Sequence, residues 1–141
     1  MRTTKSLLSA AFVIAALGVI PALAQTSATY DVPFAFSVSG KTLPAGEYKI
    51  GVDNNRTGLV QIKSADGRAT FTLTHSAGAG APSAEPKLVF HRYGDQYFLA
   101  QVSTGEVRTP ILELPSSKAE REAVTIAASR QVETVTLVAM R

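Results

Sequence analysis

Apolar residues alternate with small or polar residues along most of the chain, which is the period of a β-strand with one buried face. The clearest case is 30–39, where five apolar side chains fall on one face: Tyr30, Val32, Phe34, Phe36 and Val38. Pro33 cannot donate a ladder hydrogen bond, so we expect this strand to lie at a sheet edge or to carry a bulge at that point.

Shorter alternating segments follow, separated by turns rich in glycine, asparagine, aspartate and proline. They predict strands over 47–53, 59–63, 68–75, 87–93, 96–103, 107–114 and 132–140. In the strand 68–75, Ala69, Phe71 and Leu73 share one side and threonines occupy the other. The segment 76–86 is rich in alanine, glycine and proline and has no period, which predicts a loop.

One segment near the C-terminus has a helical pattern. Ser117 and Glu120 have the spacing of a capping box, a hydroxyl followed three residues later by a carboxylate. We expect a helix over 118–128 with Ala119, Ala123 and Ile126 on its inward side. Seven or eight strands with one helix before the last strand predict a mainly β domain. The fold class is a small antiparallel β-sandwich or a partly open barrel.

Residues 1–24 depart from the strand period and have the three parts of a secretory signal. A cationic start is followed by an apolar run of about 14 residues from Leu7 to Ile20, which spans only about 21 Å as a helix and is too short to cross a bilayer. Ala22 and Ala24 supply the small residues that signal peptidase requires, so cleavage is expected between Ala24 and Gln25. We expect an exported protein, periplasmic or secreted, with a single mature domain over 25–141 and no stable membrane span after processing.

The net charge of the chain falls once residues 1–24 are set aside. The whole chain of 141 residues has 14 basic and 11 acidic side chains, a net charge of +3, and no cysteine. Two of the basic residues lie in the signal, so the mature domain is nearly neutral and lacks the positive surplus that nucleic-acid binding needs. The absence of cysteine excludes disulfides and cysteine-ligated metals, so packing alone must hold the exported domain together.

Three blocks carry a resemblance to a known group of proteins. They are 33–36 (PFAF), 43–48 (LPAGEY) and 88–99 (LVFHRYGDQYFL), and 113–122 adds a fourth similar region. The chain resembles small exported bacterial proteins of unknown function that are common in Acidobacteria. The resemblance covers nearly the whole mature chain and implies location and size, but it transfers no activity, ligand or catalytic residue.

The sequence contains few residues whose spacing is typical of a catalytic or metal site. The two histidines, His75 and His91, are sixteen residues apart and have no metal-ligand spacing, and no G-x-S-x-G elbow is present. We therefore assign no catalytic residue, no metal ligand and no cofactor. One polar and aromatic cluster is singled out as a surface or ligand site: His91, Arg92, Tyr93 and Asp95.

These observations leave several hypotheses open. The first is a non-catalytic binding or structural module of the cell envelope whose partner is an unknown protein. The second is a lipocalin-like carrier of a small apolar ligand, in which Tyr30, Phe34, Phe36 and Tyr48 would line a cavity. An unrecognised enzyme and an outer-membrane barrel are weaker alternatives, the latter because most predicted strands are shorter than the roughly nine residues that a spanning strand requires.

Overall fold

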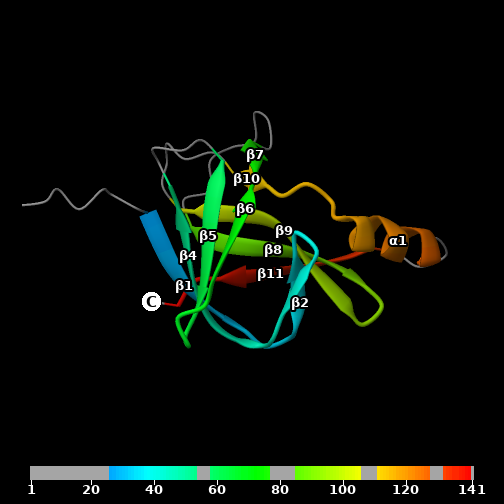
Figure 1. Ribbon diagram of the computed structural model, residues 1–141, viewed down its shortest axis with the longest axis horizontal. Helices are drawn as coiled ribbons and strands as arrows, with labels where there is room; N and C mark the ends of the chain where they lie inside the picture. The colour runs from blue at the N-terminus through cyan, green and yellow to red at the C-terminus, as the bar shows by residue number, and fades with distance from the viewer. Residues whose placement is uncertain (1–25, 54–57, 77–84, 106–110, 128–131, 141) are drawn as a thin grey trace, which may run out of the picture.

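The computed structural model describes residues 26–53, 58–76, 85–105, 111–127 and 132–140. These form two β-sheets, of which one curls into a half-barrel, with one helix before the last strand (Figure 1). The predicted fold class is therefore confirmed. The predicted signal peptide, its cleavage after Ala24 and most of the predicted loop 76–86 lie outside the described residues.

The first sheet has four antiparallel strands in the order β1 (Thr26–Val32), β4 (Gly46–Val52), β5 (Leu59–Ser64) and β6 (Ala69–Leu73). The main path of the second sheet runs β11 (Glu133–Val138), β8 (Pro86–Tyr93), β9 (Gln96–Thr104), β10 (Leu112–Glu113) and β7 (His75–Ser76). A hairpin of β2 (Phe36–Val38) and β3 (Lys41–Leu43) joins this sheet through β9. The strands of the two sheets cross steeply in Figure 1, and the core lies between them.

The segment 30–39, predicted as one strand, is divided between the two sheets. Strand β1 ends at Val32 and lies at the edge of its sheet, as Pro33 led us to expect. After Pro33 the chain enters the other sheet, where Ser37 of β2 pairs in parallel with Phe98 of β9. The strand count therefore exceeds the predicted number, because this segment divides and the short strands β3 and β7 were not anticipated.

Aromatic side chains from both sheets fill the core. The ring of Phe36 packs edge-on against Tyr48 at 5.2 Å and against Phe90 at 5.4 Å between centroids. Tyr30 is 1% exposed, and its hydroxyl donates a hydrogen bond to the Ser103 carbonyl oxygen at 3.2 Å. The residues that the carrier hypothesis placed around a cavity thus pack against neighbouring side chains and backbone.

Strand β6 turns its threonines inward and its apolar side chains outward. Thr72 is 3% exposed, whereas Phe71 is 57% and Leu73 is 68% exposed. The register explains this orientation, because Thr72 and Thr70 pair with Val60 and Ile62 of β5, whose side chains belong to the core.

The helix α1 (Lys118–Ile126) begins where the capping pattern predicted it, and the Ser117 hydroxyl accepts a hydrogen bond from the Glu120 amide. Ala123 faces inward as expected, but the inward positions of Ala119 and Ile126 are wrong, since both are exposed and Ile126 is 85% so. The second inward residue is Glu120, three positions before Ala123 on the same face. The predicted last residue, Ala128, lies outside the described part. Among the described residues, no helix has the length and apolar character needed to cross a membrane.

Candidate functional site

The four residues singled out from the sequence do not form one site. The side chains of His91 and Tyr93 point toward α1, whereas Arg92 lies on the opposite face of β8. Asp95 is exposed in the turn between β8 and β9. The alternation of a strand separates neighbouring side chains, so adjacency in the sequence did not produce adjacency of chemical groups.

His91 and Tyr93 both contact a residue that sequence reasoning missed as part of this site. The Glu120 carboxylate lies 3.1 Å from His91 Nδ1, and the Tyr93 hydroxyl donates to the same oxygen at 3.4 Å. The Glu120 side chain is only 7% exposed. Burial, followed by the charge and hydrogen bond of Glu120, raises the pKa of Tyr93. These contacts attach α1 to the outer face of β8. The capping pattern marked Glu120 locally, but nothing in the pattern links it to a residue 29 positions away.

Arg92 closes the end of the aromatic core. Its Nη1 lies 3.1 Å from a Glu133 carboxylate oxygen on β11, and its Nε donates to the Gly94 carbonyl oxygen at 2.8 Å. The guanidinium carbon lies 5.4 Å from the centroid of the Tyr97 ring, which stacks on Phe34 at 3.8 Å. Arg92 therefore joins two strands and covers a stacked aromatic pair.

A pocket of about 240 Å³ lies beside β2 and includes Asp95. Its wall combines the turn after β8 with residues of β2 and α1: Ala35, Phe36, Ser37, Thr42, Asp95, Gln96, Tyr97, Phe98 and Ala119. Of the four predicted residues, only Asp95 lines this pocket.

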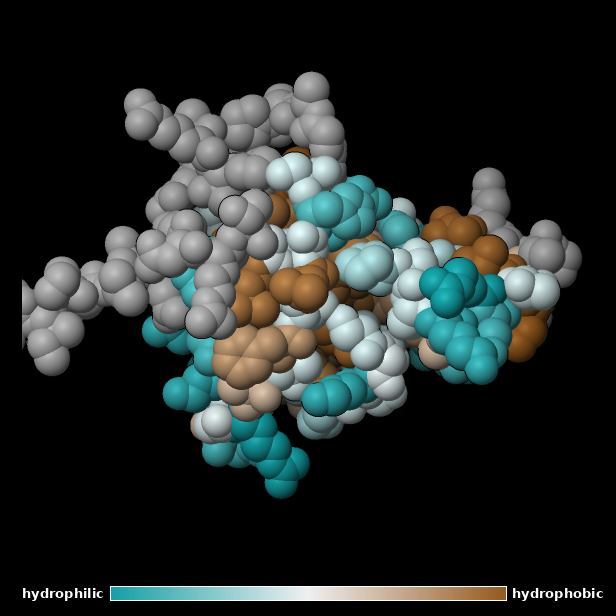
Figure 2. Space-filling view, turned by 45° about the horizontal axis from the view of Figure 1, so that its top comes forward, coloured by the Kyte–Doolittle hydropathy of each residue, from teal (hydrophilic) through white to brown (hydrophobic). Residues whose placement is uncertain are grey.

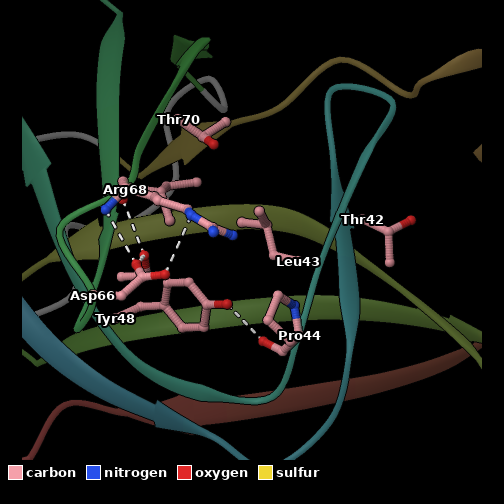
Figure 3. Close-up of a pocket in the computed structure, with 9 residues that line it drawn as sticks. Thr42, Leu43, Pro44, Tyr48, Asp66, Arg68 and Thr70 are labelled. Carbon is pink, nitrogen blue, oxygen red and sulfur yellow. Dashed lines mark hydrogen bonds and ion pairs between the residues drawn. The ribbon is translucent and has the colours of Figure 1, made fainter.

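A second pocket, of about 140 Å³, opens between β3 and the hairpin of β5 and β6 (Figure 3). We call it the hairpin pocket. It is lined by Thr42, Leu43, Pro44, Tyr48, Ile62, Ser64, Asp66, Arg68 and Thr70. Sequence reasoning treated 66–67 as a turn and 43–46 as a turn, and did not predict that the two would form opposite walls of one pocket.

Hydrogen bonds fix the polar wall of the hairpin pocket. Asp66 accepts from the Ser64 hydroxyl and from the Arg68 amide at 3.1 Å, and its other oxygen lies 3.4 Å from Arg68 Nε. The Ser64 hydrogen bond, followed by that of the Arg68 amide, lowers the pKa of Asp66. At neutral pH this wall therefore holds a carboxylate and a guanidinium of opposite charge.

The facing wall carries the apolar side chains of Leu43 and Pro44 together with the hydroxyl groups of Thr42 and Tyr48. Tyr48 donates its hydroxyl proton to the Pro44 carbonyl oxygen at 2.6 Å, and Leu43 lies beside them in Figure 3. Burial, with a smaller contribution from the Asp66 charge, raises the pKa of Tyr48, so the phenol is neutral at physiological pH. The pocket thus combines a paired polar wall with an apolar floor, which is an arrangement suited to binding.

No protein-family model matches the chain, and no curated protein or solved structure matches it. Among the described residues, no group of three or more histidine, cysteine or acidic side chains is placed to hold a metal ion. What the protein does must therefore be inferred from its own residues.

Proposed function

We propose that the chain is an exported, non-catalytic β domain of the bacterial cell envelope that binds a small, uncharged, hydroxylated group in the hairpin pocket. The observation that carries this proposal is the set of hydrogen bonds and the ion pair made by Asp66 and Arg68 in that pocket. Because Asp66 accepts three polar contacts and has a lowered pKa, it is a poor general base. The same pair offers outward N–H groups and oxygens to hydroxyls of a ligand.

The volume of the hairpin pocket and the charge of its lining residues indicate the class of ligand. A pocket of about 140 Å³ is smaller than the roughly 300–1,000 Å³ of sites that enclose a whole drug-sized molecule. It accommodates one ring of a larger chain, such as a sugar unit of an envelope polysaccharide. The Asp66–Arg68 pair is neutral as a whole, which favours an uncharged ring over a phosphate or a carboxylate.

Two further observations favour this proposal, one over an enzyme and the other over a carrier of an apolar ligand. His91 and Glu120, an acid–base pair within hydrogen-bond distance, attach a helix to a strand. The core aromatics Phe34, Phe36 and Phe90 fill the space that a carrier would need for its ligand. Export is supported by the pattern of residues 1–24 and by the resemblance to exported bacterial proteins.

Nuclear magnetic resonance titration of the purified protein with N-acetylglucosamine and its short oligomers tests the binding site. We expect shifts of the backbone amides of Thr42 and of 64–70, with a weaker affinity in Thr70→Val, which removes a hydroxyl at nearly constant volume. Thr134→Val, an exposed threonine on β11, is the matched control and should bind as the wild type does.

Two results would overturn the proposal. One is the absence of shifts around the hairpin pocket at tens of millimolar sugar. The other is hydrolysis of esters, glycans or peptides by the purified protein that disappears in His91→Ala, because turnover at that cluster would make the protein an enzyme.

A further inference from the structure

Strand β6 carries an exposed apolar stripe at the edge of its sheet. It is the last strand of the order β1-β4-β5-β6, and the side chains of Ala69, Phe71 and Leu73 all point to the outer face. Leu59 of β5, directly opposite Leu73, extends the stripe. Figure 2 shows apolar side chains gathered over the region of β5 and β6.

The ladder with β5 shows which backbone groups of β6 bond to β5 and which face away from it. The Thr74 amide donates to the Gly58 carbonyl at 2.7 Å, and the Ser64 amide donates to the Arg68 carbonyl at 2.9 Å. In an antiparallel ladder, hydrogen-bonded pairs recur at every second residue, so Thr70 and Thr72 also bond to β5. The amides and carbonyls of Ala69, Phe71 and Leu73 then face away from β5. In the part of the chain that the structure describes, no strand pairs with that edge.

The neighbouring hairpin reaches β6 from the inner side. The Ser39 hydroxyl, in the turn between β2 and β3, hydrogen-bonds to the hydroxyl of Thr72. Thr72 is buried and inward-facing, so this contact lies beneath the strand. Among the described residues, this contact from the hairpin involves the inward-facing Thr72 and not the outward-facing side chains of Phe71 and Leu73.

We propose that a second copy of this chain pairs antiparallel with β6 about a two-fold axis at Phe71. In this register Phe71 faces Phe71, and Ala69 faces Leu73. Each of these residues presents its amide and carbonyl to the partner, which gives about six main-chain hydrogen bonds between the copies. The two four-stranded sheets then become one continuous sheet with a single apolar stripe on its outer face.

Self-complementarity favours a second copy over an unrelated strand. A two-fold interface requires one patch to fit itself, and β6 does so because its unpaired backbone groups are symmetric about Phe71. Charge also permits the pairing, since Arg68 falls opposite Thr74 and no like charges oppose each other between 68 and 74. Long flat edge strands usually carry a lysine or proline that prevents such pairing, and β6 carries neither. The pairing is independent of the proposed binding function.

Sedimentation velocity of the purified protein at increasing concentration tests the proposal. The contact is limited to five residues a side, below the roughly 800 Å² per partner of standard interfaces, so we expect a dimer of micromolar or weaker affinity. Phe71→Lys should weaken it at least tenfold. Ala69→Pro should do the same, and because the Ala69 amide does not bond to β5, this variant should keep its circular dichroism and melting temperature. Val138→Lys, at a 58% exposed valine on β11, is the matched control and should dimerise as the wild type does.

A cross-link tests the position of the axis. The chain has no cysteine, so Phe71→Cys introduces a single thiol that would meet its own copy at a Cα separation of about 5.5 Å, within the range for a disulfide. Leu73→Cys is the control, because Leu73 faces Ala69 of the second copy. The second copy's own residue 73 lies four residues farther along its strand. Mild oxidation should yield a covalent dimer for Phe71→Cys and far less for Leu73→Cys.

Several outcomes would overturn the proposal. They are a wild type that stays monomeric near 1 mM, a dimer that survives both Phe71→Lys and Ala69→Pro, equal cross-linking at 71 and 73, and assemblies that grow beyond two copies. Pairing of β6 only with an extended segment of another protein would also contradict it.

Discussion

At the scale of single residues, Gly58 is constrained by its backbone and by a neighbour. Its φ is +82°, and a Cβ built there would overlap the carbonyl oxygen of Thr74. We expect Gly58→Ala to lower the free energy of unfolding by about 2–3 kcal/mol, because strain and overlap add. Gly67→Ala is the matched control, since Gly67 has φ +90° but open space around it, and should cost about 1 kcal/mol. Urea unfolding of both variants measures this, and equal losses would contradict the role of the overlap.

The buried phenol of Tyr30 makes the free energy of unfolding depend on pH in the alkaline range. Burial raises the pKa of Tyr30 to about 12 from its ordinary value of 10.0. Between these values the unfolded chain releases the phenol proton and the folded chain keeps it, so stability falls as pH rises from about 10 to 12, by up to about 2.7 kcal/mol for this group. Below pH 10 the contribution is fully present.

The variant Tyr30→Phe isolates this effect. At pH 8 it should be less stable than the wild type by about 1 kcal/mol, because it loses the hydrogen bond to the Ser103 carbonyl. Above pH 11 the difference should shrink or reverse, since phenylalanine has no proton to lose. Urea unfolding at the two pH values measures the difference, and parallel pH profiles would show that Tyr30 does not titrate as its burial predicts.

The candidate sites show what a pattern of residues reveals and what it omits. Alternation placed His91 and Tyr93 on one strand face, and both do point the same way. Their shared partner Glu120 and the Asp66–Arg68 wall of the hairpin pocket were not predicted. Both depend on which distant elements pack together, and periodicity carries no information on that.

At the scale of elements, α1 is attached to the sheet by few contacts. Glu120 and Ala123 are its buried residues, and no α1 residue belongs to the main core cluster. We expect Glu120→Ala to free the helix from β8, because it leaves His91 and Tyr93 without their shared acceptor. Hydrogen exchange should show protection lost over 118–126 and kept over β4 and β9. Glu122→Ala is the control, because Glu122 is exposed and forms an ion pair with Lys118 on the helix itself. This variant should leave the protection of both the helix and the strands unchanged. Loss of protection across all strands would show that α1 is part of the cooperative core.

The local sequence predicted whether a segment is a strand or a helix better than it predicted which face of that segment is buried. The capping box located the start of α1, whereas the segment 30–39 was predicted as one strand and divides after β1. In β6 and α1 the inward face carries Thr72 and Glu120, because these side chains find hydrogen-bond partners there, while Phe71 and Ile126 remain exposed. Hydrophobicity alone places Phe71 and Ile126 inward and Thr72 and Glu120 outward, since it gives no weight to a polar group with a satisfied partner.

At the scale of the whole molecule, the chain crosses between the two sheets more than once. It leaves the first sheet at Pro33 and again after β6, where β7 pairs with β10 of the second sheet. The Met140 amide, just beyond β11, donates to the Thr29 carbonyl of β1 at 2.9 Å and so joins the two sheets. These links join residues that are distant in the sequence, 36 positions apart for Ser76 and Leu112 and 111 for Thr29 and Met140. The sequence pattern therefore predicted the class of fold and left the order of strands undetermined.

These crossings make the aromatic core the common support of both sheets, and Phe36 lies at its centre. Its ring contacts Tyr48 of the first sheet and Phe90 of the second, and it is 1% exposed. Phe36→Asp should unfold the domain, because an unpaired buried charge together with the lost ring costs more than about 5 kcal/mol, comparable with the whole stability of a domain this size. Phe71→Asp, at the exposed phenylalanine of β6, should melt cooperatively and change the free energy of unfolding by less than about 1 kcal/mol. Thermal unfolding followed by circular dichroism distinguishes them. A cooperative transition of Phe36→Asp within a few degrees of the wild type would mean that the two sheets do not depend on this shared cluster.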